Sequence, residues 1–502
     1  MIGMNQLKKL KINTITSLMY QVVSLVSGFI LPRLILQYYG SEVNGVVSSV
    51  TQFLSIISLC ECGVGAVVQS ALYKPLANND ISEISKIYAS SNRFFRRVAY
   101  ILIAYIVVLV GVFPFINDGG YDFKFTTTLI ISIAIGTLAQ YYLGITYQLI
   151  LNAAQLVYIQ MIVRSVCIII NVIASILLII NGSSIQLVKL MSSLIFLVQP
   201  LFYVVVVKRK YRIEKNIKYS DEPIKQKWNG MAQHIATVVF ENTSVLVLTI
   251  LSTFENVSIY GVYHLVTNGL KLFFTSLTIG MKSYLGDLFA RKEFNQLNKT
   301  FDRFEWMMHT GSTFIFTVAG ILIVPFVKVY TFGVDDAEYI QPVFALCMCV
   351  ATAIYTIRLP YNFMIQSAGH FKQTQSSAII EAVLNICTSI VFVKLFGLIG
   401  VGVSALVAMV YRTAYFILYL SRHILHRGIS KTMKNILVDI LSCIIMVTST
   451  MWVTLTNITY LSWIVMAIKV FAICAVEVLL INLVIYRNNI TGFFKRRRIC
   501  DE

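Results

Sequence analysis

The sequence predicts an all-α polytopic membrane protein with about fourteen transmembrane helices. Of its 502 residues, 57% are hydrophobic and 13% are charged, and the mean hydropathy is +0.76. The charged residues are too few to coat soluble domains, and they cluster between apolar runs long enough to cross a bilayer. This composition excludes a soluble enzyme. The net charge is +18. No basic domain that could bind nucleic acid accounts for this charge, so we attribute it to membrane topology.

Hydropathy divides the chain into fourteen apolar segments of membrane-spanning length. They cover residues 12–36, 43–73, 95–116, 125–151, 156–180, 185–207, 229–253, 257–286, 305–330, 340–367, 374–395, 397–421, 435–456 and 460–486. If the N-terminus is cytoplasmic, thirty Lys and Arg residues fall in inner segments and four in outer segments. The positive-inside rule therefore predicts that both termini are cytoplasmic. The first segment is too long for a signal peptide, so we expect it to remain in the mature protein.

The two halves of the chain resemble each other at an offset of about 215–217 residues. Gly45 and Val46, for example, match Gly261 and Val262. A unit of six spans begins and ends on the same side of the membrane, so the repeat is parallel. The predicted parts are an N-terminal six-helix lobe (1–207), a basic cytoplasmic linker (208–228), a C-terminal six-helix lobe (229–421), an extra helix pair (435–486) and a basic cytoplasmic tail (487–502).

Two inner loops carry apolar residues on one helical face. They are the loop with Ile81, Ile84 and Tyr88 and the loop with Leu297, Phe301 and Phe304. We expect each loop to form an amphipathic helix that lies on the inner membrane surface. The spans at 95–116, 185–207 and 305–330 are nearly uniformly apolar, and we expect them to face lipid.

Seven basic residues lie within the predicted spans: Arg33, Arg164, Lys271, Lys282, Arg358, Arg412 and Lys469. Exposing all of them to lipid would cost on the order of 20 kcal/mol, so most must be paired or face water. His264, Lys271 and Lys282 lie at helical spacing on one face of the span 257–286, over about 27 Å of helix. A polar face of that length predicts one wall of an aqueous cavity.

Each of these residues has a structural and a functional interpretation. Arg33 and Lys282 lie near helix ends, where snorkelling to the interface would suffice. The deeper Arg164, Lys271, Arg358 and Arg412 either bind substrate or gate transport, or they form structural ion pairs. Glu61, Glu241 and Glu381 are their candidate partners, or they are groups that couple transport to an ion.

Several chemistries have no motif in the sequence. A phosphate-binding Gly-x-x-x-x-Gly-Lys-Ser/Thr loop is missing, so we expect no ATP hydrolysis on this chain. The nine cysteines lie in apolar runs or in the basic tail, with no spacing that indicates disulfides or zinc. We therefore expect no metal and no cofactor.

Four stretches of the sequence carry a family resemblance: Phe29–Gly40, Arg358–Asn362, Ala368–Gln375 leading to Glu381 and Asn385, and Phe396–Val401. With these motifs and twelve spans plus two, the chain resembles the multidrug/oligosaccharidyl-lipid/polysaccharide (MOP) exporter superfamily. Within that superfamily it is similar to the bacterial polysaccharide repeat-unit flippases of the Wzx type. The resemblance extends over essentially the whole chain.

The resemblance implies a V-shaped pair of lobes that alternates between inward and outward openings in the bacterial cytoplasmic membrane. The implied cargo is undecaprenyl-pyrophosphate-linked oligosaccharide for capsule, exopolysaccharide or O-antigen synthesis. Membrane lipids, a polysaccharide polymerase and chain-length machinery are the implied partners. A cationic cavity suits a pyrophosphate better than an organic cation.

Two other functions remain open. A multidrug or other solute antiporter of the same superfamily would need a mainly acidic lumen for cationic drugs. A membrane enzyme would need a long outer loop with catalytic groups, and every predicted outer loop is short. We therefore expect a transporter and not an enzyme.

Overall fold

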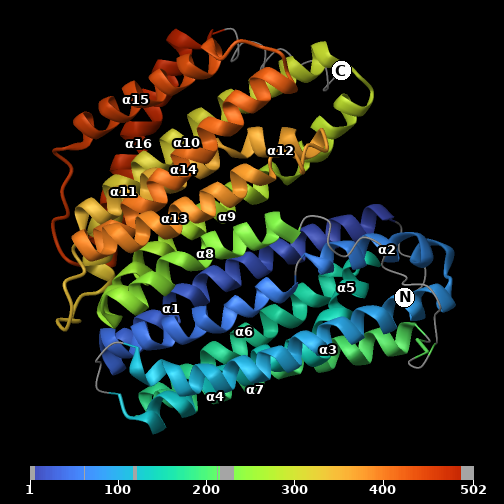
Figure 1. Ribbon diagram of the computed structural model, residues 1–502. Coiled ribbons are helices and arrows are strands. Elements are labelled where there is room, and N and C mark those ends of the chain that lie inside the picture. Colours follow the sequence, from blue (N-terminus) through green and yellow to red (C-terminus); the bar gives the residue numbers. More distant parts are fainter. Residues whose placement is uncertain are drawn as a thin grey trace. The chain divides into compact units, whose positions relative to one another are not determined.

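The computed structural model describes residues 6–61, 63–116, 121–211, 213–214, 217 and 231–487, and none of these residues lies in a strand (Figure 1). The α-helices are α1 (Gln6–Ser55), α2 (Val64–Asn78), α3 (Ile81–Val112), α4 (Phe123–Ala139), α5 (Ile145–Ala153), α6 (Val157–Ile180), α7 (Ile185–Lys210), α8 (Met231–Leu251), α9 (Phe254–Ala290), α10 (Phe294–Tyr330), α11 (Pro342–Ile357), α12 (Leu359–Ser367), α13 (Gln375–Phe396), α14 (Leu398–His423), α15 (Ser430–Thr450) and α16 (Tyr460–Ile485). Two 3-10 helices, η1 (Ile56–Glu61) and η2 (Phe113–Phe115), and one π-helical turn, η3 (Gln140–Gly144), complete the series. Most of the predicted linker and all of the predicted tail beyond Arg487 lie outside the described residues.

Twelve helical segments among the described residues are long and apolar enough to cross a membrane. The first, Lys11–Glu61, has 51 residues, and about 75 Å of helix is enough for two crossings. It bends at Gly40, where φ is +85°, a conformation that glycine adopts without steric cost. The 37-residue α9 is long enough to cross a membrane but is not among these twelve segments. The prediction of an all-helical, multi-pass membrane protein is confirmed.

The chain divides into two compact units, residues 1–258 and 259–502. In the first unit α6 packs against α1 and α7, and α4 packs against α7. Large apolar side chains such as Leu54, Phe95 and Phe113 fill its core. Because lipid tails are as apolar as leucine, this packing gains dispersion contacts and little hydrophobic transfer energy.

α8 is the first helix of the predicted second repeat, and it packs against α1 within the first unit. Gly45 allows this seam to close, because a Cβ there would lie 1.8 Å from the Phe254 carbonyl oxygen. Side-chain hydrogen bonds join Asn44 to Ser258 (2.8 Å), Ser49 to Thr249 (2.7 Å) and Gln52 to Asn242 (2.6 Å). Small residues and polar cross-links of this kind hold helices together in lipid.

In the second unit α14 packs against α11 and α13, and α10 packs against α11. The aromatic side chains of Phe301, Phe344, Tyr361 and Phe416 are fully buried between these helices. The extra pair, α15 and α16, packs against α10. This pair therefore extends the second unit along α10.

The prediction of separate amphipathic helices on the inner membrane surface is wrong. Ile84 and Tyr88 lie in the first half of α3, which runs for 32 residues without a break. Leu297 and Phe301 lie in the first turns of α10, which runs for 37 residues. All four side chains are buried against protein. No helix breaker separates the amphipathic part from the apolar part in either case, so each helix simply continues.

The prediction that the span at 305–330 faces lipid is also wrong. α10 is covered by α11, α15 and α16, and its Glu305, His309 and Ser312 are buried. By contrast, α3 exposes Val107 and Val108 as expected. α7 exposes apolar side chains such as Leu194 and Val198 on one face and lines a polar cavity with another. A high average hydropathy hid the few polar residues whose partners come from distant parts of the chain.

Candidate functional site

The second unit holds an ion triad of two arginines and one glutamate. Arg358 lies at the junction of α11 and α12, Glu381 on α13 and Arg412 on α14. Arg358 Nη1 donates to Glu381 Oε1 at 2.6 Å, and Arg412 Nη1 donates to Glu381 Oε2. Arg358 is 7% exposed, Arg412 6% and Glu381 2%. The triad carries a formal charge of +1 among helices that cross the membrane.

Tyr355 connects this triad to the polar face of α9. Lys271 Nζ lies 4.7 Å from the Tyr355 ring centroid, and Arg358 Cζ lies 5.1 Å from it. An aromatic ring between two cations weakens their repulsion, because its electron-rich face attracts both. We define the cation cluster as Lys271, Arg358, Arg412 and Glu381.

The cation cluster also contains buried polar atoms without a protein partner. Arg412 Nε donates no hydrogen bond, and neither side-chain atom of the amide of Asn385 is paired. Asn385 is 1% exposed and lies one turn from Glu381 on α13. Buried polar groups in proteins are nearly always satisfied, by water or ligand where protein does not supply a partner. These atoms and the excess positive charge favour a polar, anionic ligand.

The predicted polar face of α9 is uneven. His264 and Lys282 are exposed, whereas Lys271 is half-buried and Thr278 is buried. The His264 ring stacks on Tyr260 with centroids 5.3 Å apart. Thr278 donates its hydroxyl proton to the Phe274 carbonyl oxygen, so it needs no solvent. Only part of the face is therefore available to water or a ligand.

Arg164 lies in the first unit, in a cavity of about 490 Å³. α1, α4, η3, α5, α6 and α7 line the cavity, and Lys189 of α7 supplies a second cation. Arg164 lies beside the hydroxyl of Tyr203. Gly144 lets η3 approach α7, because a Cβ there would lie 2.8 Å from the Cβ of Pro200. π-Helical turns often occur at functional sites, and the α11–α12 junction at Arg358 occupies the corresponding place in the second repeat.

The remaining predicted residues lie on helices of the first unit. Glu61, at the end of η1, accepts a hydrogen bond from the Tyr141 hydroxyl. Glu241 is exposed on α8, and Arg33 is half-buried on α1. Glu381 forms ion pairs with two of the deep cations, Arg358 and Arg412.

Sequence reasoning missed a second buried network in the second unit, centred on Glu305. This carboxylate is 1% exposed and accepts hydrogen bonds from Tyr361 (2.6 Å), Arg427 Nη2 (2.6 Å) and Thr432 (2.5 Å). Nearby, His309 Nδ1 lies 2.5 Å from Asp439 Oδ2. These bonds fasten α15 to α10 and α12. Glu305 and His309 at i and i+4 in an otherwise apolar helix were the available signal.

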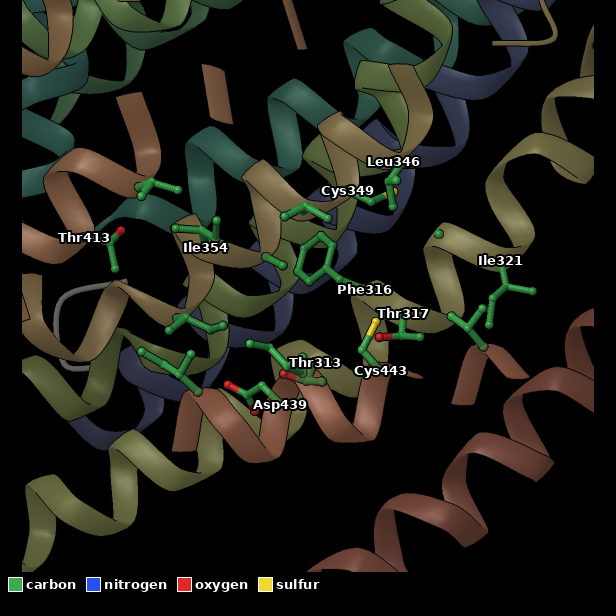
Figure 2. A pocket seen from close by; sticks show the side chains of 18 of the residues that line it. Thr313, Phe316, Thr317, Ile321, Leu346, Cys349, Ile354, Thr413, Asp439 and Cys443 are labelled. Carbon is green, nitrogen blue, oxygen red and sulfur yellow. The ribbon is translucent and has the colours of Figure 1, made fainter. Parts of the chain in front are cut away.

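Another cavity, which lies in the second unit, is apolar. It measures about 670 Å³ and lies between α10, α11, α14 and α15 (Figure 2). Phe316 and Ile354 are among its walls, and Asp439 lies at one end, where His309 holds its carboxylate. The cavity suits apolar groups and does not belong to the cationic candidate site. Within the described residues, no three His, Cys, Asp or Glu side chains gather as metal ligands would.

No model of a known protein family matches the chain, and no curated protein does. Solved structures do match it. Lipid II flippase MurJ in an inward closed conformation matches with a TM-score of 0.69 and 14% identity, over 95% of this chain and 99% of that one. An inward-facing multidrug resistance MATE transporter of the MOP superfamily has a TM-score of 0.60 and 15% identity, over 84% and 96%. A eukaryotic MATE transporter, AtDTX14, has a TM-score of 0.56 and 12% identity, over 82% and 96%.

Identities this low carry information about the fold alone. The match to MurJ runs over almost all of both chains, so it includes the extra pair α15 and α16. The chain therefore has the same fold as the flippase MurJ and the MATE transporters.

Proposed function

We propose that the chain is a transporter that flips undecaprenyl-pyrophosphate-linked oligosaccharide repeat units from the inner to the outer leaflet of the bacterial cytoplasmic membrane. Transport proceeds by alternating access, without ATP hydrolysis or other catalysis on this chain. The glycan then enters capsule, exopolysaccharide or O-antigen synthesis, where a polysaccharide polymerase and chain-length machinery receive it. Both termini lie in the cytoplasm.

The observation that carries this proposal is the ion triad, with a formal charge of +1, among membrane-spanning helices. Arg358 and Arg412 share the single carboxylate of Glu381, and Lys271 lies close by over the Tyr355 ring. Intramembrane charges are costly, and they are retained chiefly on substrate or ion pathways. A pyrophosphate carries the opposite charge and can accept several charge-assisted hydrogen bonds from guanidinium and ammonium groups.

The membrane potential favours export of such an anion. Moving two negative charges outward across an inside-negative potential of 100 mV releases about 4–5 kcal/mol. That amount exceeds the free-energy difference needed to concentrate a cargo a thousandfold, about 4 kcal/mol. The potential alone could therefore drive the flipping step.

A multidrug antiporter is the competing function, because a MATE multidrug resistance transporter shares the fold. A cationic drug would be repelled by the cation cluster, and Glu381 is already bound by two arginines. The charge balance thus favours an anionic cargo.

Reconstitution into proteoliposomes tests the proposal directly. The vesicles contain polyprenyl-pyrophosphate linked to a fluorescent oligosaccharide, and a membrane-impermeant glycosidase reports which leaflet holds the glycan. We expect flipping that accelerates when a potassium gradient with valinomycin makes the starting side negative. Vesicles with the purified Lys271→Gln variant serve as the control for leakage. Proteoliposomes that move an organic cation dye against a proton gradient, and leave the lipid-linked glycan in place, would overturn the proposal.

A further inference from the structure

We propose that the cavity of the first unit is a binding site for a sugar that bears oxyanions, either phosphate or carboxylate groups. The proposal deepens the transport function proposed above and rests on it for the source of the ligand. We define the glycan site as the 490 Å³ cavity around Arg164 and Lys189. It lies in the first unit, whereas the cation cluster lies in the second.

The lining of the glycan site has the chemistry that sugars require. Three side-chain amides, those of Gln140, Gln148 and Gln199, line the cavity. Each amide presents both donors and an acceptor, which matches the paired donors and acceptors of adjacent sugar hydroxyls. Hydroxyl groups of Tyr20, Thr51, Thr137, Ser192, Ser193 and Tyr203 complete the polar part of the wall, and the ring of Phe196 adds an aromatic face. The volume lies in the range of pockets that hold small organic ligands.

The charges of the glycan site have one sign. Arg164 and Lys189 both line it, and its described lining contains no aspartate or glutamate. Burying two cations in a membrane-spanning unit without a carboxylate is costly. The ligand that best offsets this cost supplies the missing negative charge.

The two cations lie at different depths in the membrane. α6 and α7 are antiparallel neighbours joined by the turn at 181–184. Measured from that turn at 1.5 Å per residue, Arg164 lies about 24 Å along α6 and Lys189 about 6 Å along α7. The two backbone positions therefore differ in depth by about 18 Å. A single small anion does not contact both, so the ligand is an extended chain with anionic groups at two points.

This spacing assigns the cargo to the acidic oligosaccharides. One anionic group of the glycan lies near Arg164, and a second anionic group, farther along the glycan, lies near Lys189. The amide and hydroxyl groups between the two cations then contact the neutral part of the chain. A neutral glycan would leave Lys189 without a counter-charge.

Binding measurements on the purified full chain in lipid nanodiscs test the site. Isothermal titration calorimetry is run with three probes: trigalacturonate, neutral maltotriose and inorganic pyrophosphate. We expect trigalacturonate to bind at least ten-fold more tightly than maltotriose. Arg164→Gln should weaken pyrophosphate binding, and Lys189→Gln should weaken trigalacturonate binding, each by about ten-fold to one-hundred-fold, since each removes a charge-assisted contact.

Controls separate this site from folding and from the proposed transport. Lys124→Gln removes an exposed cation from the same unit without touching the cavity, and it should leave all three affinities unchanged. Arg164→Lys retains the charge and should restore part of the pyrophosphate binding if Arg164→Gln acts through charge and not through misfolding.

Equal affinity for maltotriose and trigalacturonate would overturn the acidic-sugar assignment. An unaltered trigalacturonate affinity in Lys189→Gln would show that Lys189 extends to the membrane interface and does not bind the sugar. If binding is as expected while lipid-linked glycan stays in its leaflet, the proposed function fails and the glycan site stands.

Discussion

Replacing Glu381 by glutamine should destabilise the second unit more than replacing either of its arginine partners. Glu381 holds Arg358 and Arg412 through one bond to each of its oxygens, and all three side chains are at most 7% exposed. Glu381→Gln leaves two buried cations facing each other without a counter-charge. Removing one member of a buried ion pair typically costs about 3–5 kcal/mol. Arg358→Gln or Arg412→Gln leaves a neutral Arg–Glu pair and should cost less.

Thermal unfolding in detergent, read from intrinsic fluorescence at a fixed heating rate, measures this difference. At about 2 °C per kcal/mol for a large chain, Glu381→Gln should unfold about 6–10 °C below wild type. The control is Glu293→Gln, which changes the same residue type at an exposed position just before α10 and should shift the midpoint by less than about 1 °C. Adding Arg358→Gln to Glu381→Gln should recover part of the loss, because one uncompensated cation is removed. Equal midpoints for the Glu381 and Glu293 variants would refute the electrostatic account of the triad.

Three further predictions concern the seam, the cation cluster and the α9 face. Lys271→Gln should slow flipping of lipid-linked glycan by about ten-fold to one-hundred-fold at a normal protein level, measured in the proteoliposome assay; wild-type rates in Lys271→Gln would show that this cation is structural. Gly45→Val should lower the yield of monodisperse protein on size-exclusion chromatography, because a Cβ at this position would lie 1.8 Å from the Phe254 carbonyl oxygen. The control is Gly261→Val, which should leave the yield unchanged because a Cβ there meets nothing within 4 Å. In a background without native cysteines, His264→Cys should react with a membrane-impermeant maleimide and Thr278→Cys should not, since the first position is exposed and the second buried; equal labelling would contradict the uneven face of α9.

Part of the candidate site was predictable, because charged residues within apolar segments are rare and easily recognised in the sequence. Arg358, Glu381 and Arg412 stand out in apolar runs, and the interpretation as an ion-pair group was among the alternatives the sequence left open. Their pairing was not readable, because the three residues come from three different helix segments. Lys189 was one of the four basic residues counted on the outer side, and it lies on α7 in the wall of the glycan site. Its position one turn inside the helix depended on where α7 begins.

The sequence by itself determined that the chain is an all-helical, multi-pass membrane protein, because this class follows from local composition and length. Apolar runs of about twenty residues must cross a bilayer as helices whatever surrounds them. Only the tertiary structure decided which polar side chains are satisfied and by what. Glu305 and His309 lie in a span that we expected to face lipid. They are buried because other segments bring partners to them: Tyr361 from α12, Arg427 from the segment before α15, and Asp439 from α15. Which partner reaches a buried charge depends on the packing of helices far apart in sequence, and hydropathy contains no information about that packing.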